Sequence, residues 1–454
     1  MELSLTPGHS LGPIELGKCS LLWNVLSILR AEQARFKHVQ VCWEASKPAT
    51  GHILLSITSP PIRLLFEGVN QRLLLIEAHQ PTSHERQTSV QPVGEWIHHQ
   101  GQPISHAVGP NEPGVTLRVI HRLFGPTYPP VPHISHHNET VVSYPGVAFS
   151  FSHQVLSRVI LSVQPTEEDC QGDEGNPVQP TDAYFKPKIP QFMSSVDGDL
   201  RAARIKLGRM HLEESTSITF SFHSSSPNQE IAVVKLVVGS STSEDILCEF
   251  GAPLRTFWKE DDRMKIHAHL RSNGRSSGQS EDPNPYFMSY FNIGVDFLID
   301  PITNVVLKVV LHSNIPGEVL FARYSRCPWS LRSIQDDSDV AVSTEKAVHI
   351  NQQIKEATAT AESENDKNEG VPVETGTLCE SFGSQSAKRS PGGNTSEVPT
   401  RAFSNMIEPA MLLDRTADVI DDGLVLTRPT RLYGHPGIVL EVTEDDDVET
   451  VWLF

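Results

Sequence analysis

Side chains that can bind metal ions are concentrated in one short stretch, "HISHHNE". His133, His136, His137 and Glu139 are ligand types that hold zinc or copper, and sets of this kind serve metal-dependent hydrolases. The HExxH spacing of zinc proteases is absent, and no distant further ligand is evident. We therefore favour a solvent-exposed loop here and keep a metal-dependent enzyme using residues His133 to Glu139 as the less favoured alternative.

Other catalytic arrangements are weaker still. The sequence has no Walker A motif and no GxGxxG motif after a strand. Asp296 and Asp300 resemble a pair of catalytic carboxylates, but strand alternation places both on the outward face of a strand whose other face is apolar. The sequence thus predicts a protein that is not an enzyme, with no catalytic residues, no bound metal and no cofactor.

A second candidate site is the stretch "WKEDDRMKIH". Trp258 with Lys259, Arg263 and Lys265 could form a basic cluster beside an aromatic ring, which suits a phosphate-bearing headgroup. The acidic residues at 260–262 would neutralise these cations, so an exposed strand of mixed charge is the competing interpretation, and the one that we favour.

The composition limits the classes of partner. The chain has 454 residues and a formal net charge of −18, which argues against a nucleic-acid partner because such partners require basic surfaces. The six cysteines form no CxxC pair, which favours reduced thiols in the cytoplasm over disulfides or structural zinc. We expect neither a signal peptide nor a transmembrane segment, because no apolar stretch approaches about eighteen residues.

Four stretches share a pattern of two alternating apolar runs around a turn, beginning near residues 62, 146, 294 and 437. The third, "GVDFLIDPITNVVLKVVLHSN", has turn residues in "DPITN" and the period-two alternation of strands with one buried face. The residues predicted to face its core are Val295, Phe297 and Ile299, then Val305, Leu307, Val309 and Leu311.

An amphipathic helix is predicted before each of the first three hairpins, over 21–29, 117–124 and 241–250. The second and third end in "FGP" and "FGAP", and Ser241 with Glu244 predicts a capping box at the third. The repetition indicates an α+β fold of repeated small modules, each a helix packed on an antiparallel β-meander, interrupted by a disordered acidic insert.

The module boundaries follow from this repetition. We expect modules at 11–80, 100–165 and 180–330, and a C-terminal hairpin module at 401–454. Residues 333–400 between them are acidic, rich in Ser and Thr, and short of aromatic residues. Such a segment cannot bury enough apolar surface to offset its loss of conformational entropy, so we predict a disordered linker.

Three stretches together are distinctive: "EDDRMKIH", "YFMSYFNIGVDFLID" and "VVLKVVLHSNIPGE". They resemble the most recognisable block of the phagosome assembly factor 1 family, a eukaryotic family long catalogued as uncharacterised. Weaker matches include "IELGKCSLLWNVLSIL", "RLFGPTYPP", "YPGVAFSF" and "LVLTRPTRLYGHPGIVLEV". The resemblance covers residues 11–330 and 420–454, and the long acidic insert departs from it.

The resemblance implies a non-enzymatic regulator or adaptor of autophagy. It implies a WD-repeat β-propeller partner and, through that complex, phosphoinositide-containing membranes where autophagosomes form. The implied location is cytoplasmic, with recruitment to the preautophagosomal structure. An adaptor for transport from the trans-Golgi network to the plasma membrane is the alternative. Beside the cluster at Trp258, Tyr290 and Phe291 are candidate anchors for a partner or membrane, although we expect at least one of the two to pack in the core.

Overall fold

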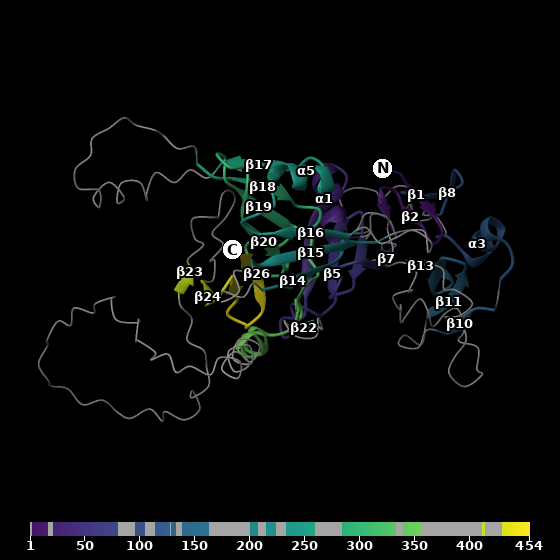
Figure 1. Cartoon of the computed structure of the whole chain (residues 1–454). Coiled ribbons are helices and arrows are strands. Elements are labelled where there is room, and N and C mark those ends of the chain that lie inside the picture. Colours follow the sequence, from purple (N-terminus) through teal and green to yellow (C-terminus); the bar gives the residue numbers. More distant parts are fainter. Residues whose placement is uncertain are drawn as a thin grey trace, which may run out of the picture.

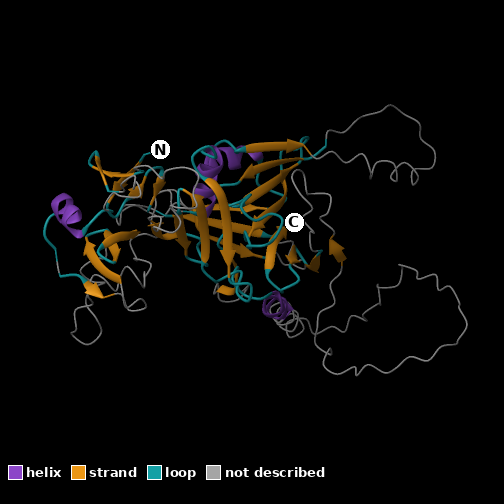
Figure 2. Cartoon of the chain, turned by 180° about the vertical axis from the view of Figure 1, so that it is seen from behind, coloured by secondary structure: helices purple, strands orange, loops and turns teal. Residues whose placement is uncertain are grey.

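The structure is a computed structural model of the chain (Figure 1). It describes residues 2–16, 21–79, 96–104, 114–127, 129–132, 139–162, 200–207, 215–223, 233–258, 284–332, 339–355, 411–413 and 429–454. Strands dominate these residues, and the helices are few and short (Figure 2). An α+β fold was expected, and the observed architecture is mostly β, with four sheets in which antiparallel pairing prevails.

Two sheets have eight strands each and are built in the same way. In each, two four-stranded antiparallel meanders join through their last strands, which are β7 and β13 in the first sheet and β20 and β26 in the second. Joining removes two exposed strand edges, so two modules complete one sheet. The first sheet runs β10 (Val131–Pro132), β11 (Glu139–Tyr144), β12 (Val147–Ser152), β13 (Val155–Ser162), β7 (Leu73–His79), β6 (Ile62–Phe66), β5 (Ile53–Ser59), β4 (Lys37–Trp43). The second runs β17 (Arg255–Trp258), β18 (Tyr286–Tyr290), β19 (Val295–Ile299), β20 (Val306–His312), β26 (Val448–Leu453), β25 (Ile438–Val442), β24 (Thr430–His435), β23 (Met411–Leu413).

The other two sheets have five strands each and also share one construction. A parallel pair, β1 with β8 or β14 with β21, connects the strands that precede two successive meanders. The first runs β3 (Ile14–Glu15), β2 (Ser10–Leu11), β1 (Leu3–Thr6), β8 (Ile97–His99), β9 (Gln102–Pro103). The second runs β16 (Val233–Val237), β15 (Ser217–Phe222), β14 (Leu200–Lys206), β21 (Trp329–Arg332), β22 (Asp339–Val342).

The chain consists of four units, each with strands of a five-stranded sheet followed by a four-stranded meander of an eight-stranded sheet. In each unit a helix lies between these two parts in the sequence. These helices are α1 (Leu22–Ala31), α3 (Leu117–Phe124), α5 (Ser243–Phe250) and residues 347–355. The predicted glycine stops are confirmed, because Gly125 and Gly251 take positive φ values of 86° and 75° after α3 and α5.

The capping box of α5 lies one residue later than predicted. Thr242 accepts a hydrogen bond from the Asp245 backbone N–H, and the Asp245 carboxylate accepts one from the Thr242 backbone N–H at 2.8 Å. The hydroxyl of Ser241 instead accepts a bond from the Val237 backbone N–H. Asp can replace Glu in the box, and the spacing alone could not choose between the two adjacent pairs.

The four predicted hairpins are present as β6–β7, β12–β13, β19–β20 and β25–β26. Their leading glycines have a steric reason: a Cβ on Gly294 would lie 2.2 Å from the Ser325 carbonyl oxygen, and one on Gly146 would lie 2.3 Å from the Gly8 nitrogen. One face was predicted wrongly, because a register shift at Leu298/Ile299 turns Leu307 outward, where it is 38% exposed.

Part of the predicted linker is ordered structure. Strand β22 and the helix at 347–355 lie within 333–400, so the prediction of disorder is wrong for these residues. Ala347, Ile350 and Ile354 are fully buried in the second core. Their helical spacing offers one apolar stripe, which the acidic composition of the whole segment obscured. Residues 333–338 and 356–400 of the predicted linker lie outside the described residues.

Two large cores correspond to the two pairs of sheets. The first draws on residues between Leu3 and Leu161, and the second on residues between Ala203 and Leu453. Two residues cross over, because Ala322 and Phe321 from the segment between β20 and β21 pack with the first core. Among the described residues, no helix has the length and apolar character that crossing a membrane requires.

Residues 313–327, called here the clasp, fasten the C-terminal half to the N-terminal half. The side-chain amide of Asn314 donates a buried hydrogen bond to Gln71 Oε1 at 2.6 Å. In return, Gln71 Nε2 donates to the backbone carbonyl oxygen of Asn314 at 2.9 Å. Arg326 lies between the two halves and donates to the carbonyl oxygens of Ser313, Ala49, Gly68 and Val69 at 2.7, 2.6, 2.6 and 3.1 Å. Burial lowers the pKa of its guanidinium to about 10, and Glu67 and Asp447 oppose this shift.

Candidate functional site

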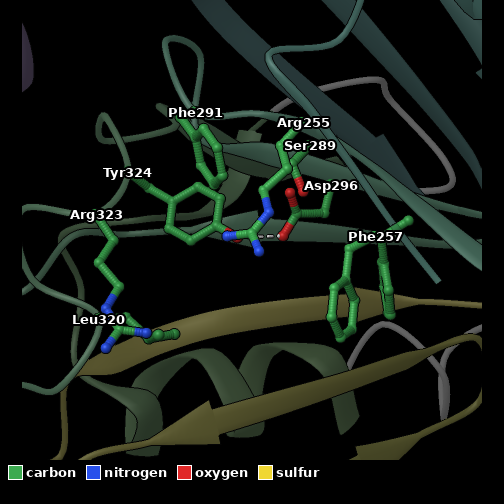
Figure 3. Close-up of a pocket in the computed structure, with 9 residues that line it drawn as sticks. Arg255, Phe257, Ser289, Phe291, Asp296, Leu320, Arg323 and Tyr324 are labelled. Carbon is green, nitrogen blue, oxygen red and sulfur yellow. Dashed lines mark hydrogen bonds between the residues drawn. The ribbon is translucent and has the colours of Figure 1, made fainter. Parts of the chain in front are cut away.

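A cavity of about 560 Å³ lies where the clasp crosses the second eight-stranded sheet (Figure 3). Strands β17, β18 and β19 form its floor, and the clasp forms one wall. Its sheet residues lie on the face opposite the second core, since core residues such as Phe297 and Tyr290 alternate with them. The lining residues are Arg255, Phe257, Phe287, Ser289, Phe291, Asp296, Leu320, Arg323 and Tyr324.

The polar centre of the cavity is a buried array of three side chains. The Asp296 carboxylate pairs with His312 Nε2 at 3.0 Å and accepts a hydrogen bond from the Tyr324 hydroxyl at 2.7 Å, both through Oδ2. The rings of His312 and Tyr324 stack with centroids 3.6 Å apart. These contacts fix the carboxylate on the rigid strand β19, while its Oδ1 is buried without a hydrogen-bond partner among the described residues.

Burial raises the pKa of the Tyr324 phenol, and the neighbouring Asp296 charge raises it further. Tyr324 therefore stays a neutral hydrogen-bond donor throughout the physiological range. Phe291 packs on the same ring with centroids 4.9 Å apart. The outcome is a carboxylate held in place by polar partners and surrounded by aromatic walls.

The array does not form a catalytic relay. A Ser–His–Asp triad needs the second imidazole nitrogen to face a serine hydroxyl. His312 Nδ1 is buried and has no hydrogen-bond partner within the part of the chain that is described, although Ser289 lines the same cavity. Nor do the described residues contain a group of three or more His, Cys, Asp or Glu side chains that could hold a metal ion. The geometry is suited to binding.

The predicted anchor residues have different environments. Trp258 is 53% exposed at the end of edge strand β17, where its ring lies 4.9 Å from that of Tyr286. Phe291 lines the cavity. Tyr290, in contrast, is 3% exposed, and its hydroxyl donates to the Gly251 carbonyl, so it is the member of the pair that packs in the core and is not a surface anchor. Tyr290 ends strand β18 with its side chain in the core, whereas Phe291 lies in the turn that follows the strand.

The three predicted basic residues, Lys259, Arg263 and Lys265, lie outside the described residues, as do His133, His136 and His137. Glu139, the last member of the histidine-rich stretch, is described. Its carboxylate pairs with Arg158 and accepts a bond from the Ser150 hydroxyl at 3.1 Å. Arg158 also contacts Glu77 at 3.1 Å, so Glu139 belongs to an ion-pair network across the first eight-stranded sheet.

The two aspartates considered as a carboxylate pair are separated by structure. Asp300 caps the turn after β19, accepting from the Ile302 backbone N–H and the Thr303 hydroxyl, and these bonds lower its pKa. Asp296 does lie on the outward face, but the clasp covers it and leaves it 7% exposed. Strand periodicity identified the face correctly and gave no sign of the segment that covers it.

Fold and site together define a mostly β protein made of two equivalent pairs of sheets, with a polar–aromatic pocket beside an exposed edge strand. The family model described as phagosome assembly factor 1 matches residues 10–454. The chain therefore belongs to the phagosome assembly factor 1 family.

Similar proteins occur in animals and plants. A PHAF1 protein of Drosophila melanogaster is 25% identical over 355 residues, covering 72% of this chain and 74% of the relative. A PHAF1 protein of Caenorhabditis elegans is 26% identical over 332 residues, covering 67% and 71%. One of Arabidopsis thaliana is 23% identical over 357 residues, covering 74% and 76%. No solved structure matches the chain significantly.

Proposed function

We propose that this chain is a non-enzymatic adaptor of autophagy whose edge strand β17 docks a WD-repeat β-propeller partner. The complex would act at phosphoinositide-containing membranes where autophagosomes form, with the chain recruited from the cytoplasm to the preautophagosomal structure. Membership of a family described as a phagosome assembly factor supports the process. The exposed edge strand supports the mode of action.

The surface of β17 is the observation that carries this proposal. All four of its residues are exposed, and Phe257 and Trp258 are 50% and 53% exposed. Leu254, immediately before the strand, is 57% exposed. Large apolar side chains on an open strand edge favour pairing with another chain, because the backbone supplies unpaired donors and acceptors and the side chains supply apolar area.

The equivalent edge of the first eight-stranded sheet, β4, is less suited to docking. Its largest apolar residues, Val39 and Trp43, are 37% and 39% exposed. Trp43 also lies against the clasp, since a Cβ on Gly317 would be 2.9 Å from its ring. The two edges therefore differ although the sheets share one topology, and β17 is the one that we assign to the partner.

Affinity purification of the tagged chain from its own cells, followed by mass spectrometry, tests the proposal. The wild-type chain should recover a WD-repeat protein in stoichiometric amount, and the double variant Phe257→Ala/Trp258→Ala should lose it. Ile302→Ala is the matched control, because Ile302 is 63% exposed in the β19–β20 turn. Full recovery by the double variant would contradict docking at β17. Recovery of Golgi coat or sorting proteins would instead favour transport to the plasma membrane.

The lipid part of the proposal needs a separate test. Charge reversal of Lys259, Arg263 and Lys265 should reduce recruitment of the purified complex to vesicles that contain phosphoinositides, because these residues follow β17 in the sequence and basic residues beside an aromatic ring suit a phosphate-bearing headgroup. Unchanged recruitment would assign membrane binding to the partner alone.

A further inference from the structure

We propose that the cavity between β17, β19 and the clasp binds a small zwitterion with an apolar side chain, that is, a free amino acid of the phenylalanine or leucine type. This proposal does not depend on the adaptor function, because it concerns a ligand that the chain would bind alone.

The cavity has the size and lining of a small-molecule site. Its volume of about 560 Å³ lies within the range of about 300–1,000 Å³ that is usual for such sites. Aromatic rings from Phe257, Phe287, Phe291 and Tyr324 line the cavity together with Leu320. The polar groups come from Arg255, Ser289, Asp296, Arg323 and the Tyr324 hydroxyl, and such convergent polar groups beside aromatic rings are expected where the orientation of a ligand matters.

Asp296 supplies the position for a positive charge. Its side chain is 9% exposed, and Oδ2 is already engaged by His312 and Tyr324. Oδ1 has no hydrogen-bond partner among the described residues. A buried carboxylate oxygen left without a donor costs free energy, and a charged donor such as an ammonium group compensates best for that cost.

Arg255 supplies the position for a negative charge. It lies on the exposed strand β17, with its guanidinium 5.9 Å above the centre of the Phe257 ring. Figure 3 shows its guanidinium directed toward the Asp296 carboxylate. Among the described residues, the polar contacts of the Asp296 carboxylate are with His312 and Tyr324, and none is with Arg255.

Opposite charges that line one cavity without touching are complementary to a molecule that carries both charges. The ammonium group would occupy the vacant side of Asp296, the carboxylate would bind Arg255, and the side chain would contact the rings of Phe291 and Tyr324. Oδ1 of Asp296 is buried, and Figure 3 shows the Arg255 guanidinium beside this carboxylate, so we expect entry of the ligand to require an outward movement of Arg255. An exposed arginine on an edge strand can make this movement at small cost.

Calorimetric titration of the purified full chain tests the inference. L-phenylalanine or L-leucine should bind saturably. N-acetyl-L-phenylalanine lacks the ammonium group and L-phenylalanine amide lacks the carboxylate, so each should bind at least about tenfold more weakly. Asp296→Asn should abolish the discrimination against the acetylated ligand, and Arg255→Gln should abolish the discrimination against the amide.

Glu249→Gln, at an exposed position on α5, is the control and should bind like the wild-type chain. A melting curve of each variant separates loss of binding from loss of folding. We expect Arg255→Gln to change folding least, because Arg255 is exposed. Absence of saturable binding by either free amino acid would overturn the inference. Equal binding of the acetylated ligand, or saturable binding of inorganic phosphate in place of the amino acids, would overturn it as well.

Discussion

Replacing Arg326 tests whether the clasp holds the two halves of the molecule together. Its guanidinium is buried and donates to carbonyl oxygens of the N-terminal half at 2.6, 2.6 and 3.1 Å. Arg326→Met keeps most of the side-chain volume but leaves these carbonyls without a donor. A hydrogen bond to a charged group contributes roughly 1.5–3 kcal/mol, and removing one partner of a buried charged arrangement costs about 3–5 kcal/mol. The cost of desolvating the guanidinium offsets part of the summed hydrogen-bond energy, so we expect Arg326→Met to lower the free energy of unfolding by about 3–5 kcal/mol.

Arg326→Lys extends this prediction. Lysine keeps a positive charge but lacks the planar fork that reaches several carbonyls at once, so we expect a loss smaller than that of Arg326→Met. Guanidinium denaturation at pH 7 measures both variants, with Arg255→Met as the exposed control, expected to change stability by no more than about 0.5 kcal/mol. A loss below about 1 kcal/mol in Arg326→Met would refute the reasoning, since the carbonyls would then be satisfied without the guanidinium.

Three further perturbations follow from the same structure. Gly68→Ala should destabilise the chain by about 1–3 kcal/mol, because the new Cβ would lie 2.1 Å from the Thr50 carbonyl oxygen; a neutral result in thermal melts would show that this contact relaxes freely. Burial lowers the pKa of His435, and the nearby charge of Lys355 lowers it further. Because the unfolded chain therefore binds a proton at higher pH than the folded chain, stability should fall as the pH drops below about 6.5. His435→Gln should make the melting temperature depend less on pH between about pH 5 and 7.5, and an unchanged dependence would contradict this. Burial raises the pKa of Tyr290 to about 12, so stability that is present below about pH 10 is lost as the pH rises towards 12. Tyr290→Phe should lower the free energy of unfolding by about 1 kcal/mol at pH 7, because it removes the hydrogen bond to Gly251. The variant should also lose less stability at alkaline pH than the wild-type chain, and parallel pH profiles of the two would argue against this.

The repeated hairpins could be predicted because their signals are local. Alternation over five to eight residues identifies a strand and its buried face, as it did for Val295, Phe297 and Ile299, which are all fully buried. The inward face of β20 was predicted less well, because a β-bulge shifts the alternation by one residue and leaves no mark in the pattern of Leu307 and its neighbours.

The pairing of modules could not be predicted from these patterns. Strand β7 pairs with β13, although Arg158 lies 79 positions after its partner His79 in the chain. β20 pairs with β26 across an even longer insert. Periodicity specifies which face of a strand is apolar, whereas the choice of neighbouring strand depends on how two sheets close around a shared core.

The candidate site shows the same division between local and distant signals. Trp258 and Phe291 were identified from composition and from the similarity of their block to one family, and both lie at or near the cavity. Asp296, His312 and Tyr324 were not recognised as a group, because the clasp must cross the sheet before they meet. The signal that could have found them is the rare occurrence of Asp within an otherwise apolar strand, opposite a strand that ends in His.

Hydrogen exchange of the chain with and without its co-purified WD-repeat partner tests the central claim most directly. If the partner adds to the open edge of the second eight-stranded sheet, backbone amides in β17 should become protected, while those of β4, the equivalent edge of the first sheet, should exchange at unchanged rates. Unchanged exchange in β17 within a stoichiometric complex would show that the partner binds elsewhere, and the docking account would then be wrong.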